Sequence, residues 1–334
     1  MERIPSSPPP IKPLPKQESR PRWSVMIPVY NCSGFLSETL QAVLQQALPE
    51  EQMQIEVIDD GSTDADVAAL VQQISHGRVG YFRQPQNVGS LRNFETCINR
   101  ATGHLVHILH GDDLIKPGYY DSMQRLFDRY PQIGAAFCRY VYIGQSSKPL
   151  YYRDAEMDTP GILDNWLLRL AERQRLQFCT VTVKREVYEK LGGFYGVDYG
   201  EDWEMWMRIA RDYPVAYEPA VLAAYRLHMA SISGQSYTSA KNLKDLQWVI
   251  QTIQQYLPEP DRERLYKKAM KFYAHYAIKI ANDLWYGLHN REGARTQVQE
   301  ALLMHKDPLM YWKIAKLYTK MALNITSFIP RKNN

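Results

Sequence analysis

Two acidic clusters, each directly after a short apolar run, carry the reactive side chains of this 334-residue chain. The first is Asp59-Asp60-Gly61-Ser62-Thr63-Asp64, and the second is His110-Gly111-Asp112-Asp113. The apolar runs before them are rich in β-branched residues and predict β-strands. In an open α/β sheet, ligands bind beyond the carboxyl ends of the strands. We therefore expect a site that holds a sugar hydroxyl, a metal ion, or both.

The two clusters suit different ligands. Carboxylates at Asp59 and Asp60 can accept hydrogen bonds from ribose hydroxyls or a base N–H, and Gly61 permits a tight turn beside a ligand. Asp112 and Asp113 suit Mg²⁺ or Mn²⁺, because hard cations take oxygen ligands. The alternatives are an Asx-turn with a helix cap for the first cluster and a plain polar loop for the second.

Two motifs further along the chain add polar groups. Glu201 and Asp202 stand at the start of a predicted helix, where they complement the helix dipole or, if one faces a site, supply a general base. Arg226 and His228 follow a predicted strand two residues apart, which puts both on one face. There they could meet a diphosphate or a metal, although a lone histidine is more often structural.

Strand and helix patterns alternate through the first hundred or so ordered residues, which predicts a parallel sheet with crossover helices. The expected strands there are residues 23–28, 54–58, 79–83 and 105–109, and the expected helices are 37–47, 65–74 and 90–101. Beyond Pro117 we expect helices at 119–130, 162–173 and 203–211 and strands at 134–143 and 215–225. The end of the chain predicts helices at 247–256, 262–284 and 295–323.

Composition divides the chain into three parts. Residues 1–21 are proline-rich and polar, which predicts a disordered leader before an α/β domain at 22–240 and a helical region at 241–334. A net charge of +4 gives no support for nucleic-acid binding. Four widely spaced cysteines predict buried thiols in a reducing cytoplasm. No apolar run is long enough to span a membrane, so we expect a cytoplasmic protein or one held peripherally on the inner face of the membrane.

These four motifs, together with Ile27-Pro28-Val29-Tyr30-Asn31 and the segment from Asn87 to Asn93, resemble the family 2 glycosyltransferases of the GT-A fold. The resemblance runs from about Trp23 to about Ser233. It implies a Rossmann-like α/β fold with a mostly parallel central sheet flanked by helices, to which the sequence pattern adds a helical C-terminal appendage. It also implies a hexosyltransferase that inverts the anomeric centre, with a UDP-sugar as the expected donor and Mg²⁺ or Mn²⁺ as the cofactor.

The resemblance assigns roles to individual residues. On the nucleotide-sugar side it implies Pro28, Val29, Tyr30, Asp59, Asp60, Arg92 and Asp112, with Tyr30 against the base. It implies Asp113 as the metal ligand with His228 near the metal and diphosphate, and Asp202 as the catalytic base. The acceptor side is expected at Thr180, Glu201 and Trp203.

Two departures from the family pattern matter. His110 replaces the first carboxylate of a full Asp-x-Asp, so metal binding rests on Asp112 and Asp113. No Gln-x-x-Arg-Trp follows the Glu-Asp motif, which favours addition of one sugar to a glycan, lipid-linked or other hydroxyl acceptor. Two alternatives are a catalytically silent GT-A binding or scaffold domain and a sugar nucleotidyltransferase.

The C-terminal hundred residues lie outside the resemblance. Residues 310–323 mix lysines with aromatic and aliphatic side chains, as a basic amphipathic helix does. One hypothesis is attachment to anionic lipid, near a lipid-linked acceptor. The alternative, which we favour, is a helix packed on the catalytic domain or on another subunit of an oligomer.

Overall fold

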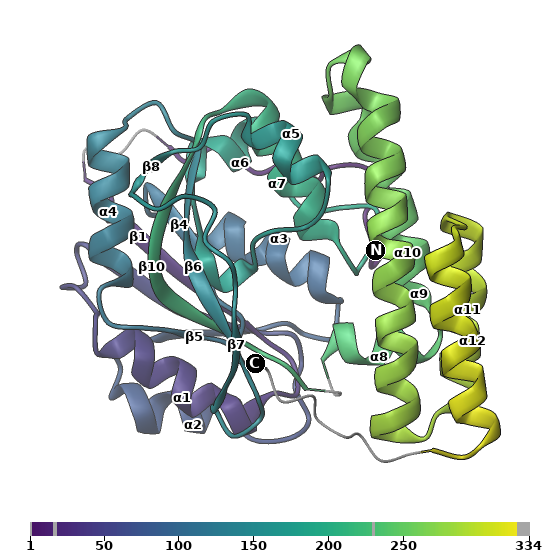
Figure 1. Cartoon of the computed structure of the whole chain (residues 1–334). Helices are drawn as coiled ribbons and strands as arrows, with labels where there is room; N and C mark the ends of the chain where they lie inside the picture. Colours follow the sequence, from purple (N-terminus) through teal and green to yellow (C-terminus); the bar gives the residue numbers. More distant parts are fainter. Residues whose placement is uncertain (1, 16–18, 229–230, 326–334) are drawn as a thin grey trace. The chain divides into compact units, whose positions relative to one another are not determined.

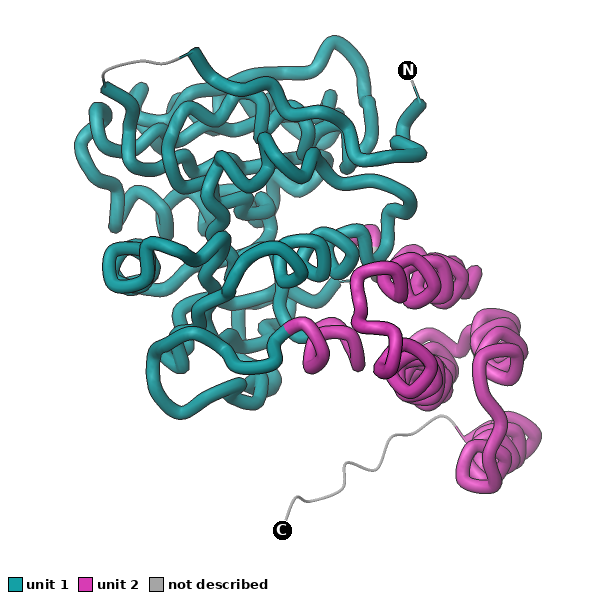
Figure 2. The backbone as a smooth tube through the Cα atoms, turned by 90° about the horizontal axis from the view of Figure 1, so that it is seen from above, with its two compact units in different colours: residues 1–166, 175–228 teal, residues 167–174, 229–334 magenta. Residues whose placement is uncertain are grey.

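The computed structural model describes residues 2–15, 19–228 and 231–325. The chain forms two compact units (Figures 1 and 2). Unit 1 comprises residues 1–166 and 175–228, and unit 2 comprises residues 167–174 and 229–334. The division after residue 228 precedes the expected boundary at 240, because the last strand of the sheet ends at Arg226 and the helices of unit 2 begin soon afterwards.

Unit 1 is built on one mixed, mostly parallel sheet, which confirms the predicted fold class. Its strand order is β3-β2-β1-β4-β9-β6-β10-β5, with β7 paired to β6 and β8 paired to β10. The strands are β1 (Trp23–Val29), β2 (Met53–Asp59), β3 (Gly80–Arg83), β4 (Leu105–Ile108), β5 (Leu114–Ile115), β6 (Ala135–Ile143), β7 (Pro149–Tyr152), β8 (Gly161–Ile162), β9 (Val181–Lys184) and β10 (Val215–Arg226).

Strand direction explains why the two acidic clusters meet. Strand β1 is parallel to β2 on one side and to β4 on the other, and Val29 stands opposite Asp59. The carboxyl ends of these three strands therefore lie at one edge of the sheet. Strand β10 is parallel to β6, while β9 runs antiparallel between β4 and β6. The long β10 thus ends in the same direction as β6 and brings Arg226 toward the end of β4.

Helices cover the sheet, in a core made of β-branched and aromatic side chains. They are α1 (Ser33–Leu44), α2 (Val67–Ser75), α3 (Ser90–Arg100), α4 (Tyr119–Arg129), α6 (Arg185–Leu191) and α7 (Glu201–Asp212), with a 3-10 turn η1 (Phe178–Thr180). Helices α1, α2 and α4 share one core cluster with the strands. The helix expected at 162–173 is only α5 (Trp166–Ala171), because residues 161–162 pair with β10 instead. Strands β5, β7 and β8, of two to four residues each, are too short to show a sequence period.

Residues 2–15 of the segment expected to be a disordered leader pack on the rest of unit 1, which differs from the prediction. Ile11 is buried, and the backbone N–H groups of Gly193 and Gly196 donate to the carbonyls of Pro9 (2.8 Å) and Pro5 (2.9 Å). Prolines lose little conformational freedom on ordering, and their carbonyls remain available as acceptors. Composition alone therefore underestimated the order of this segment.

Unit 2 is helical. Its helices are α8 (Ile232–Thr238), α9 (Lys241–Thr252), α10 (Glu259–Leu288), α11 (Arg291–Met304) and α12 (Pro308–Ala322), with a 3-10 turn η2 (Ile253–Tyr256). The single helix expected at 295–323 is interrupted before Pro308, where Asp307 caps α12 by accepting from the Met310 N–H at 2.8 Å. Within the described ranges, none of the helices combines the length and the apolar character that crossing a bilayer requires.

Helix α7 is fixed in unit 1 by a buried ion pair. The Nε of Arg208 lies 2.8 Å from the Glu204 carboxylate, and both side chains are at most 4% exposed. The same guanidinium donates to the carbonyls of Leu191 (2.7 Å) and Gly193 (2.8 Å). Arg208 therefore ties the helix to the loop that precedes it.

Arg208→Ala is expected to lower the free energy of unfolding by about 3–5 kcal/mol, because it strips a buried carboxylate of its cation. Arg22→Ala, at the exposed pair with Asp128, is the matched control and should cost about 0–1 kcal/mol. Denaturant unfolding measures both. Equal losses in the two variants would contradict a special role for the buried pair.

Candidate active site

The turn after β1 presents an aromatic ring at the sheet edge. Pro28 and Val29 are buried, whereas Tyr30 is 51% exposed. Asn31, with φ of 49°, locks this turn to the first acidic cluster: its N–H donates to Ser62 Oγ at 3.0 Å, and its Oδ1 accepts from Thr63 N at 2.7 Å. The tyrosine ring is thus held on a rigid turn with its face open to stacking.

Asp59 at the end of β2 is committed to the protein. Its carboxylate is fully buried, accepts from Ser62 N at 2.8 Å and Tyr81 Oη at 2.7 Å, and is paired with the Arg83 guanidinium. The side chain therefore orders the loop after β2. It does not face a ligand in this conformation.

Asp60 holds the loop that precedes α3. Its carboxylate accepts from the backbone N–H groups of Val88 (2.7 Å) and Gly89 (2.9 Å) and from Asn87 Nδ2 (3.0 Å). Burial raises the pKa of Asp60 despite these bonds. Arg92, at the start of α3, bonds Glu95 at 2.7 Å. The first acidic cluster thus shapes the loop that leads into the helix carrying Arg92.

Asp113 joins the end of β4 to the end of β10. Its Oδ1 accepts from the Arg226 N–H at 2.8 Å, and Thr39 Oγ1 donates to its carbonyl at 2.9 Å. Burial and the neighbouring charge of Asp112 raise the pKa of Asp113 well above the ordinary value. Most of this residue is therefore engaged in holding two strands together.

Asp112 is the more accessible carboxylate of the pair. Its Oδ2 lies 2.9 Å from His228 Nε2, and its side chain is 22% exposed. Burial alone would raise the pKa of Asp112, but the hydrogen bond with His228 and the nearby imidazole of His110 lower it. The structure therefore brings His228 to Asp112, whereas the sequence-based assignment grouped His228 with Asp113.

The His110, Asp112 and Asp113 side chains can offer a metal three ligand atoms that lie within 4.8 Å of one another. Among the residues that the structure describes, His110 Nε2 and Asp113 Oδ2 are buried atoms without a hydrogen-bond partner. Buried polar atoms normally have a partner, and a cation bound here would provide one for both atoms. Imidazole nitrogen with carboxylate oxygen is a suitable donor set for a divalent transition metal such as Mn²⁺. The residues present therefore fit the cofactor that the sequence predicted.

A buried aromatic cluster links the end of β4 to α7. The His110 ring stacks on Phe94 with centroids 5.2 Å apart and an angle of 13°, and lies 4.5 Å from Phe178. Phe178 in turn contacts Trp206 of α7 at 5.7 Å, and Phe194 lies between them at 5.2 and 6.0 Å. The metal-side loop and α7 are thus packed on the same rings.

Asp202 lies in the first turn of α7. The turn begins at Gly200, whose φ of 90° favours glycine, and Asp202 Oδ1 accepts from the Trp203 N–H at 2.7 Å. The Asp202 side chain is 9% exposed and Glu201 is 7% exposed. The carboxylate of Asp202 therefore lies at a helix N-terminus, on a helix that is packed through Trp206.

Comparison with known proteins decides the family. Residues 24–192, about half the chain, match the model for glycosyl transferase family 2. This chain belongs to that family. An uncharacterized protein of Mycobacterium tuberculosis is 26% identical over 70% of this chain and 75% of its own length. An uncharacterized glycosyltransferase of Rickettsia typhi is 25% identical over 68% of this chain and 70% of its own length.

Solved structures agree with the fold. TarS of S. aureus has a TM-score of 0.62 at 13% identity, covering 92% of this chain and 93% of its own, and has been solved in complex with UDP-GlcNAc. The mannosyltransferase PcManGT of Pyrobaculum calidifontis, solved with GDP-Man and Mn²⁺, has a TM-score of 0.57 at 20% identity over 96% of this chain and 84% of its own. These likenesses show that the chain has the GT-A fold.

Three of the side chains selected from the sequence are buried in this glycosyltransferase. Trp203 and Thr180 are fully buried, and Thr180 Oγ1 donates to the Gln177 carbonyl at 2.7 Å; their assignment to the acceptor side stays a prediction. Arg226 is also buried: its guanidinium bonds Glu38 at 3.0 Å and the Asp112 carbonyl at 2.7 Å. Its side chain therefore supports the loop after β4 and does not extend toward a diphosphate.

The sequence contained one signal that was undervalued. His110 replaces a carboxylate ligand of the family pattern, yet one of its ring nitrogens lies within 4.8 Å of carboxylate oxygens of Asp112 and Asp113.

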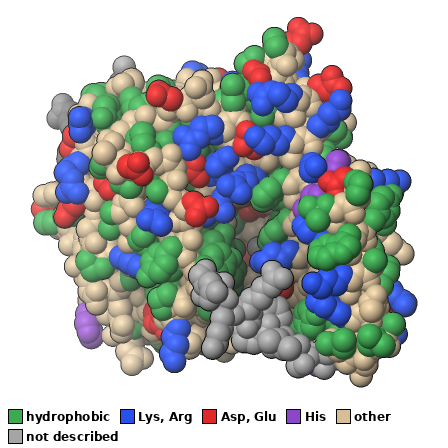
Figure 3. Space-filling model, viewed as in Figure 1, with side chains coloured by type: hydrophobic (Ala, Val, Ile, Leu, Met, Phe, Trp, Pro, Cys, Tyr) green, Lys and Arg blue, Asp and Glu red, His purple; other side chains and the backbone are tan. Residues whose placement is uncertain are grey.

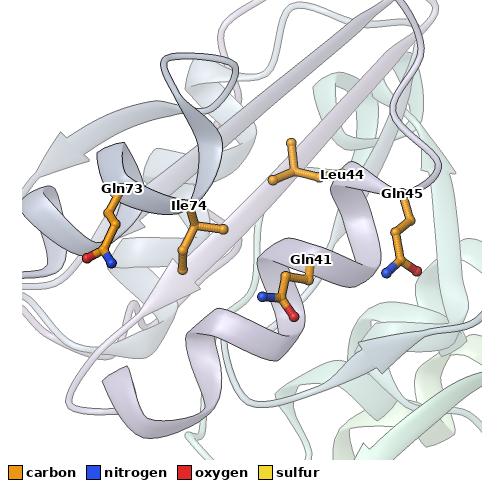
Figure 4. Close-up of a pocket in the computed structure, with 5 residues that line it drawn as sticks. All are labelled: Gln41, Leu44, Gln45, Gln73 and Ile74. Carbon is orange, nitrogen blue, oxygen red and sulfur yellow. The ribbon is translucent and has the colours of Figure 1, made fainter.

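A surface hollow of about 510 Å³ between α1 and α2, lined by Gln41, Leu44, Gln45, Gln73 and Ile74, includes none of the candidate residues (Figure 4). It has no charged side chain to hold a diphosphate.

Proposed function

We propose that this glycosyltransferase moves one hexose from a UDP-sugar to a hydroxyl of a glycan, lipid-linked or other acceptor, with inversion at the anomeric carbon. The observation that carries the proposal is the meeting of Asp112 and His228 at 2.9 Å, from two strand ends that are far apart in sequence. The complexes of TarS with UDP-GlcNAc and of PcManGT with GDP-Man and Mn²⁺ support a nucleotide sugar as the donor.

The donor nucleotide is proposed to lie along the ends of β1 and β2. Tyr30 stacks on the base, beside the turn made by Pro28 and Val29. Asp59 and Asp60 act through the loops that they order, and Arg92 lies on the helix that follows one of these loops. The nucleotide is thus held by a preorganised edge, which limits the entropy lost on binding.

The metal is proposed to be Mg²⁺ or Mn²⁺, held by Asp112 and His228 with His110 and Asp113 completing the set. A divalent cation bound there neutralises charge that develops on the leaving diphosphate. Asp113 contributes the oxygen left without a partner, while its other oxygen remains on Arg226 N.

Asp202 is proposed as the general base. Its carboxylate accepts the proton of the acceptor hydroxyl while that oxygen attacks the anomeric carbon from the face opposite the nucleotide. The aromatic cluster from His110 to Trp206 keeps the helix of Asp202 in register with the metal-side loop. Correct alignment of the two substrates contributes as much as the base itself. Glu201, the neighbouring acidic residue, is proposed for the acceptor side.

Asp202→Asn is expected to reduce release of nucleoside diphosphate by about 10²- to 10⁴-fold, because the variant keeps the shape of the side chain but cannot accept a proton. Turnover is measured on a panel of radiolabelled sugar nucleotides with Mn²⁺. Asp212→Asn, at the other end of the same helix and paired with Arg211, is the matched control and should retain activity.

The alternatives give different outcomes in the same assay. Pyrophosphate release would favour a sugar nucleotidyltransferase, and no turnover with any donor would favour a silent scaffold domain. Full activity of the Asp202→Asn variant would contradict the assignment of the base.

Asp112→Asn and His228→Ala are each expected to weaken Mn²⁺ binding by at least about tenfold, since each removes a proposed ligand. Electron paramagnetic resonance of free Mn²⁺ during titration measures the affinity without turnover. His104→Asn removes an exposed histidine of unit 1 and should leave Mn²⁺ binding unchanged. Unaltered binding in the first two variants would place the metal elsewhere.

We also propose that α12 contacts anionic membrane surfaces. One face of the helix packs within unit 2 through Met310, Ile314, Leu317 and Met321. The exposed large hydrophobic side chains from its start to the residue after its end are Leu309, Tyr311, Trp312, Tyr318 and Leu323. Lysines accompany them, and from Pro308 onward the sequence contains no acidic residue. In Figure 3, hydrophobic and basic side chains gather over α11 and α12. Exposed aromatics beside lysines suit the interface of an anionic bilayer.

Trp312→Ala, with 59% of its side chain exposed, is expected to lower pelleting with phosphatidylglycerol vesicles several-fold, because it removes the largest interfacial ring. Tyr266→Ala on α10, 37% exposed, is the matched control. Co-sedimentation with phosphatidylcholine vesicles tests the requirement for negative charge. Equal pelleting of all proteins, or concentration-dependent dimerisation that Trp312→Ala abolishes, would favour a protein partner instead.

A further inference from the structure

We propose that residues 2–15, the N-terminal strap, are a working part of the donor site, and that Arg3 is a positioning residue for the nucleotide-binding loop Asn87–Gly89. The inference rests on the proposed function, because it assigns the donor nucleotide to this edge of the sheet. The strap belongs to unit 1, as do both loops that it contacts.

Arg3 is the first link of a chain of hydrogen bonds that ends on a site carboxylate. Its Nη1 donates to the Asn87 carbonyl at 3.1 Å, and its Nη2 donates to Asn87 Oδ1 at 2.5 Å. Asn87 Nδ2 then donates to Asp60 Oδ2 at 3.0 Å. The guanidinium therefore fixes both the backbone and the amide orientation of Asn87, and so sets the donors that Asp60 receives.

Gly89 lets the guanidinium approach the loop. Its φ of +92° is a conformation that favours glycine, and a Cβ at this position would lie 3.3 Å from Arg3 Nε. The loop backbone and the flat face of the guanidinium are thus close together. A site that needs Gly-Arg contact of this kind is specific to arginine, since a lysine ammonium cannot bridge two acceptors in one plane.

The strap also holds Arg92. The carbonyl of Glu2 accepts from Arg92 Nε at 2.8 Å, while Arg92 Nη1 bonds Glu95 at 2.7 Å. These two partners fix the plane of the Arg92 guanidinium. Because Arg92 is proposed to serve the base or diphosphate, the strap orients a donor-binding group as well as the loop before it.

The other contacts of the strap reach the loop before α7. The Pro5 and Pro9 carbonyls accept from Gly196 and Gly193, and a Cβ on Gly192 would lie 2.9 Å from Pro8 Cβ. This loop leads directly to Asp202. One extended segment thus contacts both the donor loop and the loop that leads to the proposed base.

The strap has separate attachments for stability. Ile11 is 2% exposed, and the Lys12 carbonyl accepts from the buried Arg185 at 2.9 Å. Beyond it, Arg20 donates to the carbonyls of Thr102 (2.8 Å) and Gly103 (2.9 Å), at the opposite end of β4 from the acidic cluster. Arg3 lies outside these attachments. Its hydrogen bonds go to Asn87 of the nucleotide-binding loop and are exposed to solvent, so loss of Arg3 should act locally on nucleotide binding.

The test compares Arg3→Ala with Arg20→Ala in the full-length protein. Both variants remove an arginine that bonds two oxygen acceptors from the same end of the chain. Calorimetry with UDP, and with GDP in parallel, is expected to show about tenfold weaker binding for Arg3→Ala and less than twofold change for Arg20→Ala. Arg3→Lys should recover only part of the affinity. In turnover assays, Arg3→Ala should raise KM for the donor while kcat changes little.

Amide hydrogen exchange gives a readout that needs no nucleotide. Residues 84–94 should exchange faster in Arg3→Ala than in the wild-type protein or in Arg20→Ala. Unchanged exchange there, or equal loss of nucleotide affinity in both variants, would overturn the role of Arg3. Wild-type protein that binds neither nucleotide would overturn the proposed function and this inference together, whereas normal binding unaffected by Arg3→Ala would overturn the inference alone.

Discussion

The site depends on buried carboxylates at the ends of two parallel strands, because each must be satisfied and its partners then determine what lies nearby. Asp113 accepts a hydrogen bond from the Arg226 N–H at 2.8 Å, which brings the end of β10 to the end of β4. His228, two residues later, is then in reach of Asp112. Asp60 accepts hydrogen bonds from the N–H groups of Val88 and Gly89 and so fixes the loop Asn87–Gly89. Leaving Asp113 or Asp60 buried without these N–H partners would cost more free energy than one hydrogen bond contributes. The conformation that supplies the partners is therefore strongly favoured.

Buried contacts fix α7 in a similar way. Its ion pair between Glu204 and Arg208 closes the preceding loop, and Trp206 packs on Phe178, which also carries the His110 ring. Rings spread over more than a hundred residues of sequence thereby connect the metal-side loop to the helix of Asp202. Tightly packed side chains cannot shift independently, so the metal-side loop and the helix of Asp202 keep a fixed relative position. This suits two groups that are proposed to act on the same reacting atoms.

The sequence predicted the parallel strands because alternating periods are local signals, and the family followed from the resemblance of its motifs. It assigned the metal to Asp113 and the nucleotide sugar to Asp112 without knowing their environments, since burial and the Arg226 N–H depend on how β10 pairs with β6. It also expected disorder in residues 1–21, where contacts with Gly193 and Asn87 are non-local. Trp203 and Thr180 were assigned by the family resemblance, which says nothing about the direction of a side chain.

The pKa values of the two adjacent carboxylates in this site are shifted in opposite directions. Burial and repulsion from Asp112 raise the pKa of Asp113, while the contact with His228 lowers that of Asp112. The contact with His228 thus favours the charged form of Asp112, the more accessible carboxylate, whereas burial disfavours the charged form of Asp113. His110 stands where the family pattern has a carboxylate, so one fewer negative charge lies beside Asp112 and Asp113, and its imidazole keeps a nitrogen donor at that position.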